Sequence, residues 1–194
     1  MKKVADFLFE VGHMAKIDRT GFYFLWSGKQ NLAEHTNRVC YIGYALGMLD
    51  GTVDVNKIVV MCLFHDITEI RSLDANYIAQ KYVTIDEHKI LDDQIKELPF
   101  KEQIKSMVGE YQERESMESI YAKEADILEL VLFLKQELDV GNPQAGEWIK
   151  DVTPRLKTDL GKKLCDDILA TRYDNRRWFD KTDKRWSTRN EKTQ

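Results

Sequence analysis

Apolar residues recur every three or four positions along most of this chain, which is the spacing of amphipathic helices. The clearest helix should begin at Asn31, where Asn31 and Glu34 match a capping box, and end at Gly51. The next is expected over residues 55–70 after a cap at Asp54, because its middle is apolar on nearly all sides. Further helices are expected at residues 4–15, 84–98, 100–111, 119–138 and, in one or two pieces, 144–170. The pattern therefore predicts an all-α fold.

The segments between these helices carry turn signals and charged residues. Residues 16–21 should form a loop, and residues 71–82 a loop or short helix at the rim of a site. Thr84 and Glu87 match a second capping box at the start of the helix that follows.

The 194 residues, of which 43% are hydrophobic, are enough for one domain with a sizeable core and too few for two large ones. We expect this domain at residues 1–170, with its core at about residues 16–138. The tail at residues 171–194 is rich in Arg, Lys and Trp but has little periodicity. It should be partly disordered unless Trp178 or Trp186 docks on the body or on a partner chain.

Charge and cysteine content indicate which partners and which cell compartment to expect. The net charge of -4 argues against a protein whose main task is to bind nucleic-acid phosphates. The three cysteines are odd in number and widely spaced, which indicates reduced thiols rather than disulfides. No apolar stretch reaches the length of a membrane span. We therefore expect a cytoplasmic protein with neither a membrane nor a nucleic acid as its partner.

Polar side chains follow directly on the most apolar stretch of the chain, residues 58–64. His65, Asp66 and Glu69 come next, and in one continuous helix His65 and Glu69 would share a face. Taking a carboxylate from water into an apolar interior costs several kcal/mol or more unless a cation or hydrogen bonds compensate it. A metal ion is the simplest compensation.

Two other polar residues stand on inward-facing or apolar parts of helices. His35 falls on the apolar stripe of its helix, and a single inward histidine is more often a hydrogen-bonded core residue than a ligand. Asp126 interrupts the most apolar part of the helix at 119–138, either on a solvated flank or pointing at a cation. Because a second inward histidine, His65, is followed by a carboxylate, His35 and Asp126 are more plausible as metal ligands.

Together, His35, His65, Asp66 and Asp126 offer two imidazoles and two carboxylates from three helices. Nitrogen and oxygen donors without thiolate suit Mn²⁺, Co²⁺, Fe²⁺, Ni²⁺ or Zn²⁺, and four protein ligands leave positions open on a six-coordinate ion. A divalent ion can lower the pKa of its water from ~15.7 towards about 7 and can hold a phosphoryl oxygen beside it. The set therefore indicates phosphoester hydrolysis by attack of a metal-bound water.

In order and spacing, this set resembles the metal ligands of the HD-domain phosphohydrolases, and the resemblance covers about residues 16–138. It implies an HD-domain helical bundle with a buried metal site and, commonly, a homodimer. More narrowly, four parts of the chain resemble the 5′-deoxynucleotidase branch, which includes proteins labelled oxetanocin-like: Arg19-Thr20-Gly21, Leu32-Ala33-Glu34-His35-Thr36, His65-Asp66-Ile67-Thr68-Glu69 and Asp74.

This resemblance implies a role for each matching residue beyond the four ligands. Glu69 would act on the attacking water as base or orienting group, Arg19 would hold the 5′-phosphate, and Asp74 would contact the sugar or complete the reacting site. The chain departs from close relatives at two points. It has Leu73 where they often have Gly, and Thr20 where some have a Trp that excludes a 2′-hydroxyl.

The expected function is thus a metal-dependent 5′-deoxynucleotidase that releases phosphate from (deoxy)nucleoside 5′-monophosphates. The alternatives are a dNTP triphosphohydrolase, a cyclic-nucleotide phosphodiesterase, or a non-catalytic HD module that binds a nucleotide. Only Arg19, Arg71 and Lys81 stand as candidate cations near the HD helix, which disfavours a triphosphate. Glu69 disfavours the non-catalytic module, because a structural ion needs no further acid beside it.

Overall fold

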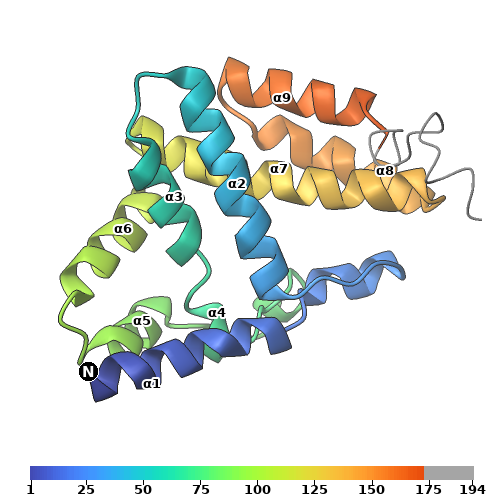
Figure 1. Cartoon of the computed structure of the whole chain (residues 1–194). Coiled ribbons are helices and arrows are strands. Elements are labelled where there is room, and N and C mark those ends of the chain that lie inside the picture. Colours follow the sequence, from blue (N-terminus) through green and yellow to red (C-terminus); the bar gives the residue numbers. More distant parts are fainter. Residues whose placement is uncertain (173–194) are drawn as a thin grey trace, which may run out of the picture.

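The computed structural model describes residues 1–172, and most of them are helical (Figure 1). The α-helices are α1 (Lys2–Val11), α2 (Leu32–Asp50), α3 (Val55–Phe64), α4 (Glu69–Ser72), α5 (Glu87–Ile95), α6 (Lys101–Glu113), α7 (Met117–Asp139), α8 (Pro143–Val152) and α9 (Asp159–Ala170). Short 3-10 helices are η1 (Gly12–Lys16), η2 (Thr20–Leu25), η3 (Ala79–Lys81) and η4 (Thr153–Arg155).

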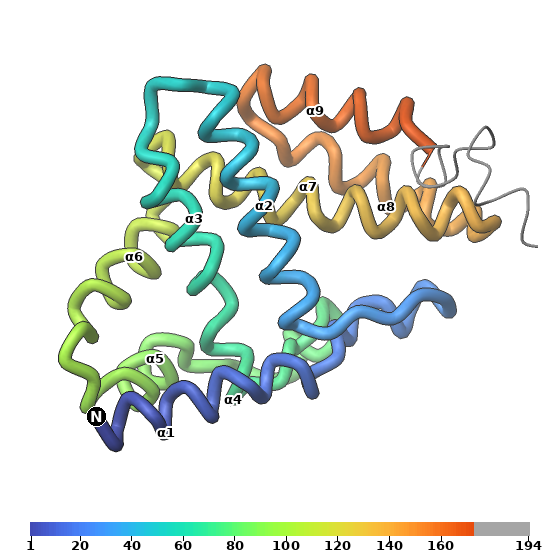
Figure 2. Tube along the Cα trace, in the orientation of Figure 1, coloured from blue at the N-terminus to red at the C-terminus, as the bar shows by residue number. Residues whose placement is uncertain are grey.

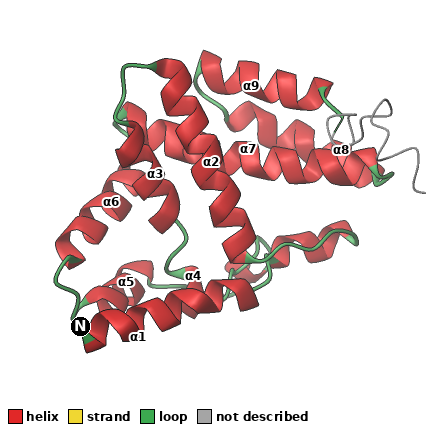
Figure 3. Ribbon diagram, viewed as in Figure 1, coloured by secondary structure: helices red, strands yellow, loops and turns green. Residues whose placement is uncertain are grey.

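Within residues 1–172 no β-strand forms, and the only bridge pairs Asp18 with Asn31 (Figure 3). The all-α prediction is confirmed. In this part of the chain no helix combines the length and the apolar character that a bilayer span requires. The expectations for the tail, including Trp178 and Trp186, concern residues outside the described range.

Three helices form the centre of the molecule. Helix α2 packs against both α3 and α7, and α3 also packs against α7. Helices α8 and α9 lie along α7, whereas α1, α4 and α5 gather at the other end of α2 and α3 (Figure 2). Two buried apolar clusters match this division, one around α2, α3 and α7 and one beneath α1, α5 and α6. A site between α2, α3 and α7 therefore rests on the best-packed part of the fold.

The start and end of α2 follow the sequence signals. The Asn31 side chain accepts a hydrogen bond from the Glu34 amide at 2.9 Å, and the Glu34 carboxylate accepts one from the Asn31 amide at 3.1 Å. Gly51 ends the helix in the left-handed conformation, with φ of 75°. At α5 the predicted capping box of Thr84 and Glu87 is wrong. Asp86 caps that helix instead, because its carboxylate reaches the amide of Lys89 at 2.9 Å.

The helix expected over residues 55–70 is broken, so this prediction is wrong. Helix α3 ends at Phe64, where the Cys62 carbonyl accepts a hydrogen bond from Nδ1 of His65 at 2.7 Å. The next turn is tighter than an α-helix, with the amide of Glu69 bonded to the Asp66 carbonyl at 3.0 Å, three residues back. His65 and Glu69 therefore do not occupy one face of one α-helix.

A buried acid on α7 holds the start of α9 in place. Glu124 is 2% exposed and accepts hydrogen bonds from the amides of Lys157 and Thr158 at 2.7 and 2.6 Å. It also accepts one from the Thr158 hydroxyl at 2.5 Å. The same hydroxyl caps α9 by accepting a hydrogen bond from the amide of Gly161 at 2.9 Å. Glu124 thus fixes the start of α9 against α7.

Gly161 has no room for a side chain, because a methyl group there would overlap the carboxylate of Glu124. We expect Gly161→Ala to lower the free energy of unfolding by about 1–3 kcal/mol, since the buried carboxylate cannot move without losing its hydrogen bonds. Urea titration followed by circular dichroism measures this change. The matched control is Gly109→Ala, because nothing lies within 4 Å of that position on α6. The control should gain about 0.5–1 kcal/mol, and equal effects of both variants would contradict the assignment.

Candidate metal centre

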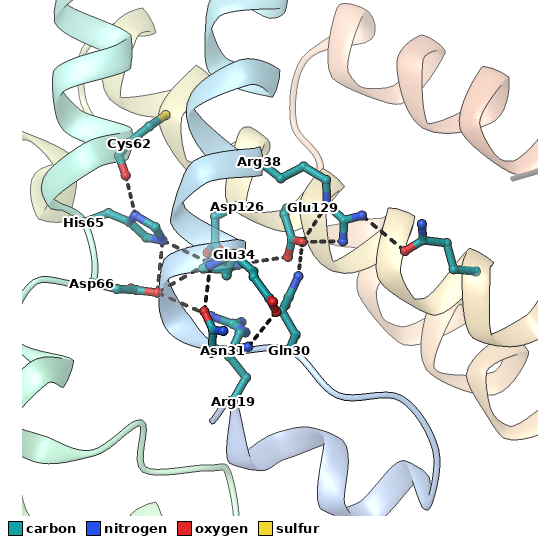
Figure 4. Close-up of polar contacts among 12 residues, drawn as sticks. Arg19, Gln30, Asn31, Glu34, Arg38, Cys62, His65, Asp66, Asp126 and Glu129 are labelled. Carbon is teal, nitrogen blue, oxygen red and sulfur yellow. Dashed lines mark hydrogen bonds and ion pairs between the residues drawn. The ribbon is translucent and has the colours of Figure 1, made fainter. Parts of the chain in front are cut away.

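Four side chains meet where α2, α3 and α7 come together (Figure 4). His35 lies on α2, His65 and Asp66 directly follow α3, and Asp126 lies on α7. The two Nε2 atoms of the histidines are 3.2 Å apart. Oδ2 of Asp66 lies 3.0 Å from Nε2 of His65 and 3.4 Å from Nε2 of His35, and Oδ1 of Asp126 lies 3.4 Å from the latter. The structure thus brings together the four residues proposed as ligands from the sequence.

Both imidazole rings are held through Nδ1, which leaves each Nε2 facing the cluster. Nδ1 of His65 donates to the carbonyl of Cys62 at 2.7 Å, and Nδ1 of His35 donates to Glu129 at 2.6 Å. With hydrogens on Nδ1, the neutral rings point two nitrogen lone pairs at each other and at carboxylate oxygens. Only a cation or a proton between these atoms can compensate such an arrangement.

Glu129 supports His35 and is fully buried, with 0% exposure. Besides the histidine it accepts hydrogen bonds from Nε2 of Gln30 at 2.6 Å and from Nε and Nη2 of Arg38 at 2.8 and 2.5 Å (Figure 4). Burial alone would raise the pKa of Glu129, but its hydrogen bonds with His35 and Gln30 and the charge of Arg38 lower it. A carboxylate fixed in this way holds the imidazole of His35 in one orientation.

The cluster opens towards solvent on its carboxylate side. The side chains of Asp66 and Asp126 are 20% and 17% exposed. Burial works against the ionised form of Asp126, but the Lys123 ammonium, 2.6 Å from Oδ2, and His35 hold the pKa of Asp126 well below its usual range. Burial likewise lowers the pKa of His35, yet its contacts with Asp126, Asp66 and Glu129 raise that pKa well above 6.5. In this site, then, positive charge is strongly favoured.

These donors fit a divalent metal ion. One ligand atom each from His35, His65 and Asp126 lies within 4.8 Å of the others, and Asp66 touches both histidines. The paired Nε2 lone pairs and the two carboxylates supply nitrogen and oxygen donors, which suit the borderline divalent ions better than a thiolate-preferring metal. His35, His65, Asp66 and Asp126 would hold the ion, and the exposed side of the carboxylates would leave room for substrate.

Glu69 stands beside this cluster at the start of α4. Its Oε2 is buried and has no hydrogen-bond partner among residues 1–172. Burial raises the pKa of Glu69 to about 9, and repulsion from Asp66 and Asp74 adds to the effect. Burial among other acids thus favours the neutral carboxyl group, and positive charge in the site would lower its pKa.

Arg19 points into the site from the segment between η1 and η2. Its side chain is 16% exposed, and Nη1 lies 3.4 Å from Oδ2 of Asp66. The guanidinium also lies 6.0 Å from the ring centre of Phe22, which stacks on Phe133 with centroids 3.8 Å apart. The Arg19 side chain is therefore held beside the cluster by its neighbours and is not a solvated surface charge.

Asp74 fixes the loop that carries Arg19. Its carboxylate accepts a hydrogen bond from the amide of Thr20, and its carbonyl accepts one from the Thr20 hydroxyl at 2.6 Å. Leu73 and Asp74 both have positive φ, 64° and 39°. A bulky residue is rare in this conformation, so the surrounding contacts must hold it. The contact of Asp74 with substrate or reacting atoms stays a prediction.

Three residues of the site were missed from the sequence: Lys123, Glu129 and Arg38. Each lies three positions from a proposed ligand on the same helix, so one helical turn brings it alongside. The available signal was a charged residue inside an apolar run, which Glu129 shows most clearly between Leu128 and Leu130.

Two cations considered from the sequence lie elsewhere. Arg71 binds Glu10 through Nε and Nη2 at 2.6 and 2.9 Å, and Lys81 lies 4.4 Å from the ring centre of Tyr77. Neither contacts the four clustered residues in the described part of the chain.

The chain resembles known proteins over most of its length. A family model described as an HD domain matches residues 11–168. A crystal structure from structural genomics is 26% identical and covers 93% of this chain and 100% of its own, with a TM-score of 0.71. A conserved hypothetical protein from Pyrococcus furiosus is 22% identical and covers 86% and 99%, with a TM-score of 0.71. A predicted metal-dependent phosphohydrolase from Magnetospirillum magnetotacticum is 20% identical and covers 87% and 90%, with a TM-score of 0.68. No curated protein matches.

If Glu129 orients a metal-binding histidine, its replacement should weaken the site without unfolding the protein. We expect Glu129→Gln to reduce Mn²⁺ or Zn²⁺ affinity by about 10–100-fold, measured by competition with a chelator. Glu137→Gln is the matched control, because Glu137 lies on the same helix but accepts a hydrogen bond from Ser27 instead. Unchanged affinity in Glu129→Gln, at an unchanged melting temperature, would refute this role.

Proposed function

This chain belongs to the HD-domain family and shares its fold with a predicted metal-dependent phosphohydrolase, and we propose that it releases phosphate from (deoxy)nucleoside 5′-monophosphates. Its cofactor is a divalent metal ion. The observation that carries the proposal is the convergence of His35, His65, Asp66 and Asp126 beside Glu69, whose buried Oε2 has no hydrogen-bond partner among residues 1–172. When bound, a divalent ion lowers the pKa of water and neutralises phosphoryl charge.

In this proposal Arg19 binds the phosphate of the substrate. Its planar guanidinium suits a phosphate with two parallel hydrogen bonds, and it reaches the site already supported by Phe22. The 3.4 Å separation from Asp66 is long for a charge-assisted hydrogen bond, so turning towards a phosphate costs Arg19 little. The bonds between Thr20 and Asp74 keep its backbone in place during that change.

Glu69 then serves as the proton acceptor. A carboxyl group buried among other acids is a poor anion by itself, and a pKa of about 9 reflects that. Positive charge in the centre would lower this pKa and free Oε2 to accept a proton from the attacking water. Lys123 keeps its ion pair with Asp126, whose Oδ2 lies 2.6 Å from the ammonium group.

The contacts of the basic residues favour a monophosphate over a triphosphate. Arg71 is paired with Glu10 and Lys81 lies over Tyr77, so neither extends the phosphate site. Lys123 pairs with Asp126, so of the cations considered Arg19 is left to bind phosphate, and one guanidinium suits a single phosphate group. The buried, unpaired Oε2 of Glu69 favours catalysis over a nucleotide-binding module without activity.

The test is phosphate release from ribo- and deoxyribonucleoside 5′-monophosphates, 5′-triphosphates, 3′-monophosphates and cyclic nucleotides. The protein is first stripped of metal, and Mn²⁺, Co²⁺, Zn²⁺ or Mg²⁺ is then added back separately. We expect release from 5′-monophosphates that disappears with the metal. Triphosphate from dNTPs, opening of cyclic nucleotides, or silence across the panel with metal bound would each contradict the proposal.

The same assay on Glu69→Gln separates catalysis from binding. Loss of the proton acceptor should lower turnover by about 10²–10⁴-fold while metal content stays at the wild-type level. Glu97→Gln serves as the control, since Glu97 pairs with Lys3 on the surface. Parallel loss of metal and activity in Glu69→Gln would make Glu69 a structural residue.

We also propose a homodimer that forms through α2 and α3. A groove of about 680 Å³ lies there, lined mainly by apolar side chains. Tyr41 and Leu63 line it and are 70% and 50% exposed, which is unusual for neighbouring large apolar groups on a monomer. Light scattering during gel filtration should give twice the chain mass of 22.7 kDa, and Tyr41→Asp should shift it towards the monomer. A monomer at tens of micromolar wild-type protein would contradict this.

A further inference from the structure

A second pocket opens next to the loop of Arg19. It measures about 660 Å³ and is walled by Gly21 and Phe24 from η2, Tyr77 from the segment before η3, Leu130 from α7 and Trp148 from α8. No role was assigned to this pocket from the sequence or from the site geometry. Its size falls within the range of pockets that hold small molecules.

Three residues of the pocket wall are linked to residues of the site through the chain or through a hydrogen bond. Gly21 follows Arg19 by two residues, and Leu130 follows Asp126 by one turn of α7, about 6 Å along the helix axis. Asn76, which also lines the pocket, donates a hydrogen bond from Nδ2 to the hydroxyl of Thr20 at 3.0 Å. A ligand with its phosphate at Arg19 therefore has this pocket nearby.

Three aromatic side chains line the pocket. Tyr77 is 73% exposed and Phe24 is 48% exposed, while Trp148 is partly buried against the core. Exposed rings around a concave space favour a flat, unsaturated ligand, because stacking buries both faces at small entropic cost. Lys81 lies 4.4 Å from the ring centre of Tyr77 and helps hold that side chain. Charged groups at the edge come from Asp151 and Arg155.

We propose that this pocket binds the base of the nucleotide substrate by stacking on Tyr77, Trp148 and Phe24, while the phosphate lies at Arg19. The assignment rests on the proposed function, because it takes the position of the phosphate from there. In this proposal, the three aromatic residues make a nucleotide bind more tightly than a sugar phosphate without a base. The recognition is by ring stacking, so it acts in KM rather than in the chemical step.

Binding of a ligand that cannot be hydrolysed tests the pocket without relying on turnover. The probes are 2′-deoxyadenosine carrying a 5′-methylenephosphonate and the matching sugar phosphonate without a base, titrated calorimetrically into metal-loaded protein. We expect at least tenfold tighter binding of the base-bearing probe to the wild type. Tyr77→Ala should weaken that binding by about 5- to 150-fold and leave the base-free probe unaffected.

Tyr82→Ala is the matched control, because Tyr82 is a tyrosine five positions away, 83% exposed and absent from the pocket wall. It should change neither probe. Trp148→Ala should act like Tyr77→Ala, whereas Trp148→Phe, which keeps a ring in the core, should retain most of the preference for the base. Melting temperatures identify any variant that has lost its fold.

The outcomes separate this inference from the proposed function. Base-dependent binding that Tyr77→Ala abolishes supports the pocket, even if no nucleotide in the panel releases phosphate. Phosphate release from 5′-monophosphates with the same KM in wild type and Tyr77→Ala, and equal binding of the two probes, overturns the pocket and leaves the function standing. Equal weakening of both probes in Tyr77→Ala also overturns it, because the effect would not depend on the base.

Discussion

Two carboxylates and two imidazoles lie so close together that they need a positive charge between them, and the other contacts of the site depend on this requirement. Asp66 and Asp126 lie within 3.4 Å of histidine nitrogens whose lone pairs face each other. Without a cation this arrangement is costly in a partly buried place. The tight packing of α2, α3 and α7 keeps the groups together, so the packing energy of the core stabilises a cluster that would otherwise separate. The centre is thus prepared for an ion before it binds one.

Three acidic residues on helix α7 have different roles because they face different neighbours. Glu124 accepts hydrogen bonds from the start of α9 and has a purely architectural part in the fold. Asp126, two residues later, faces the histidines and the ammonium of Lys123. Glu129 is buried and accepts hydrogen bonds from His35 and Arg38. Spacing on the helix turns these three acids towards three different neighbours.

The sequence predicted what depends on local pattern and on the chemistry of residue types. The cap at Asn31, the end at Gly51 and the inward direction of His35 all follow from helical periodicity. The break after Phe64 has no proline or glycine to mark it and arises where the side chain of His65 bonds a carbonyl at the helix end. Contacts across the fold, such as Glu129 with His35 or the aromatic walls around Trp148, depend on tertiary packing that periodicity does not encode.

The central claim is that His35, His65, Asp66 and Asp126 bind one metal ion. Anomalous diffraction from crystals of the protein loaded with Mn²⁺ alone tests it most directly. If these four residues bind the ion, the map will contain a single strong peak within about 2.3 Å of both Nε2 atoms and of one oxygen from each carboxylate. A fully occupied peak held by other residues, or a fully ordered centre without a peak at saturating Mn²⁺, would contradict it.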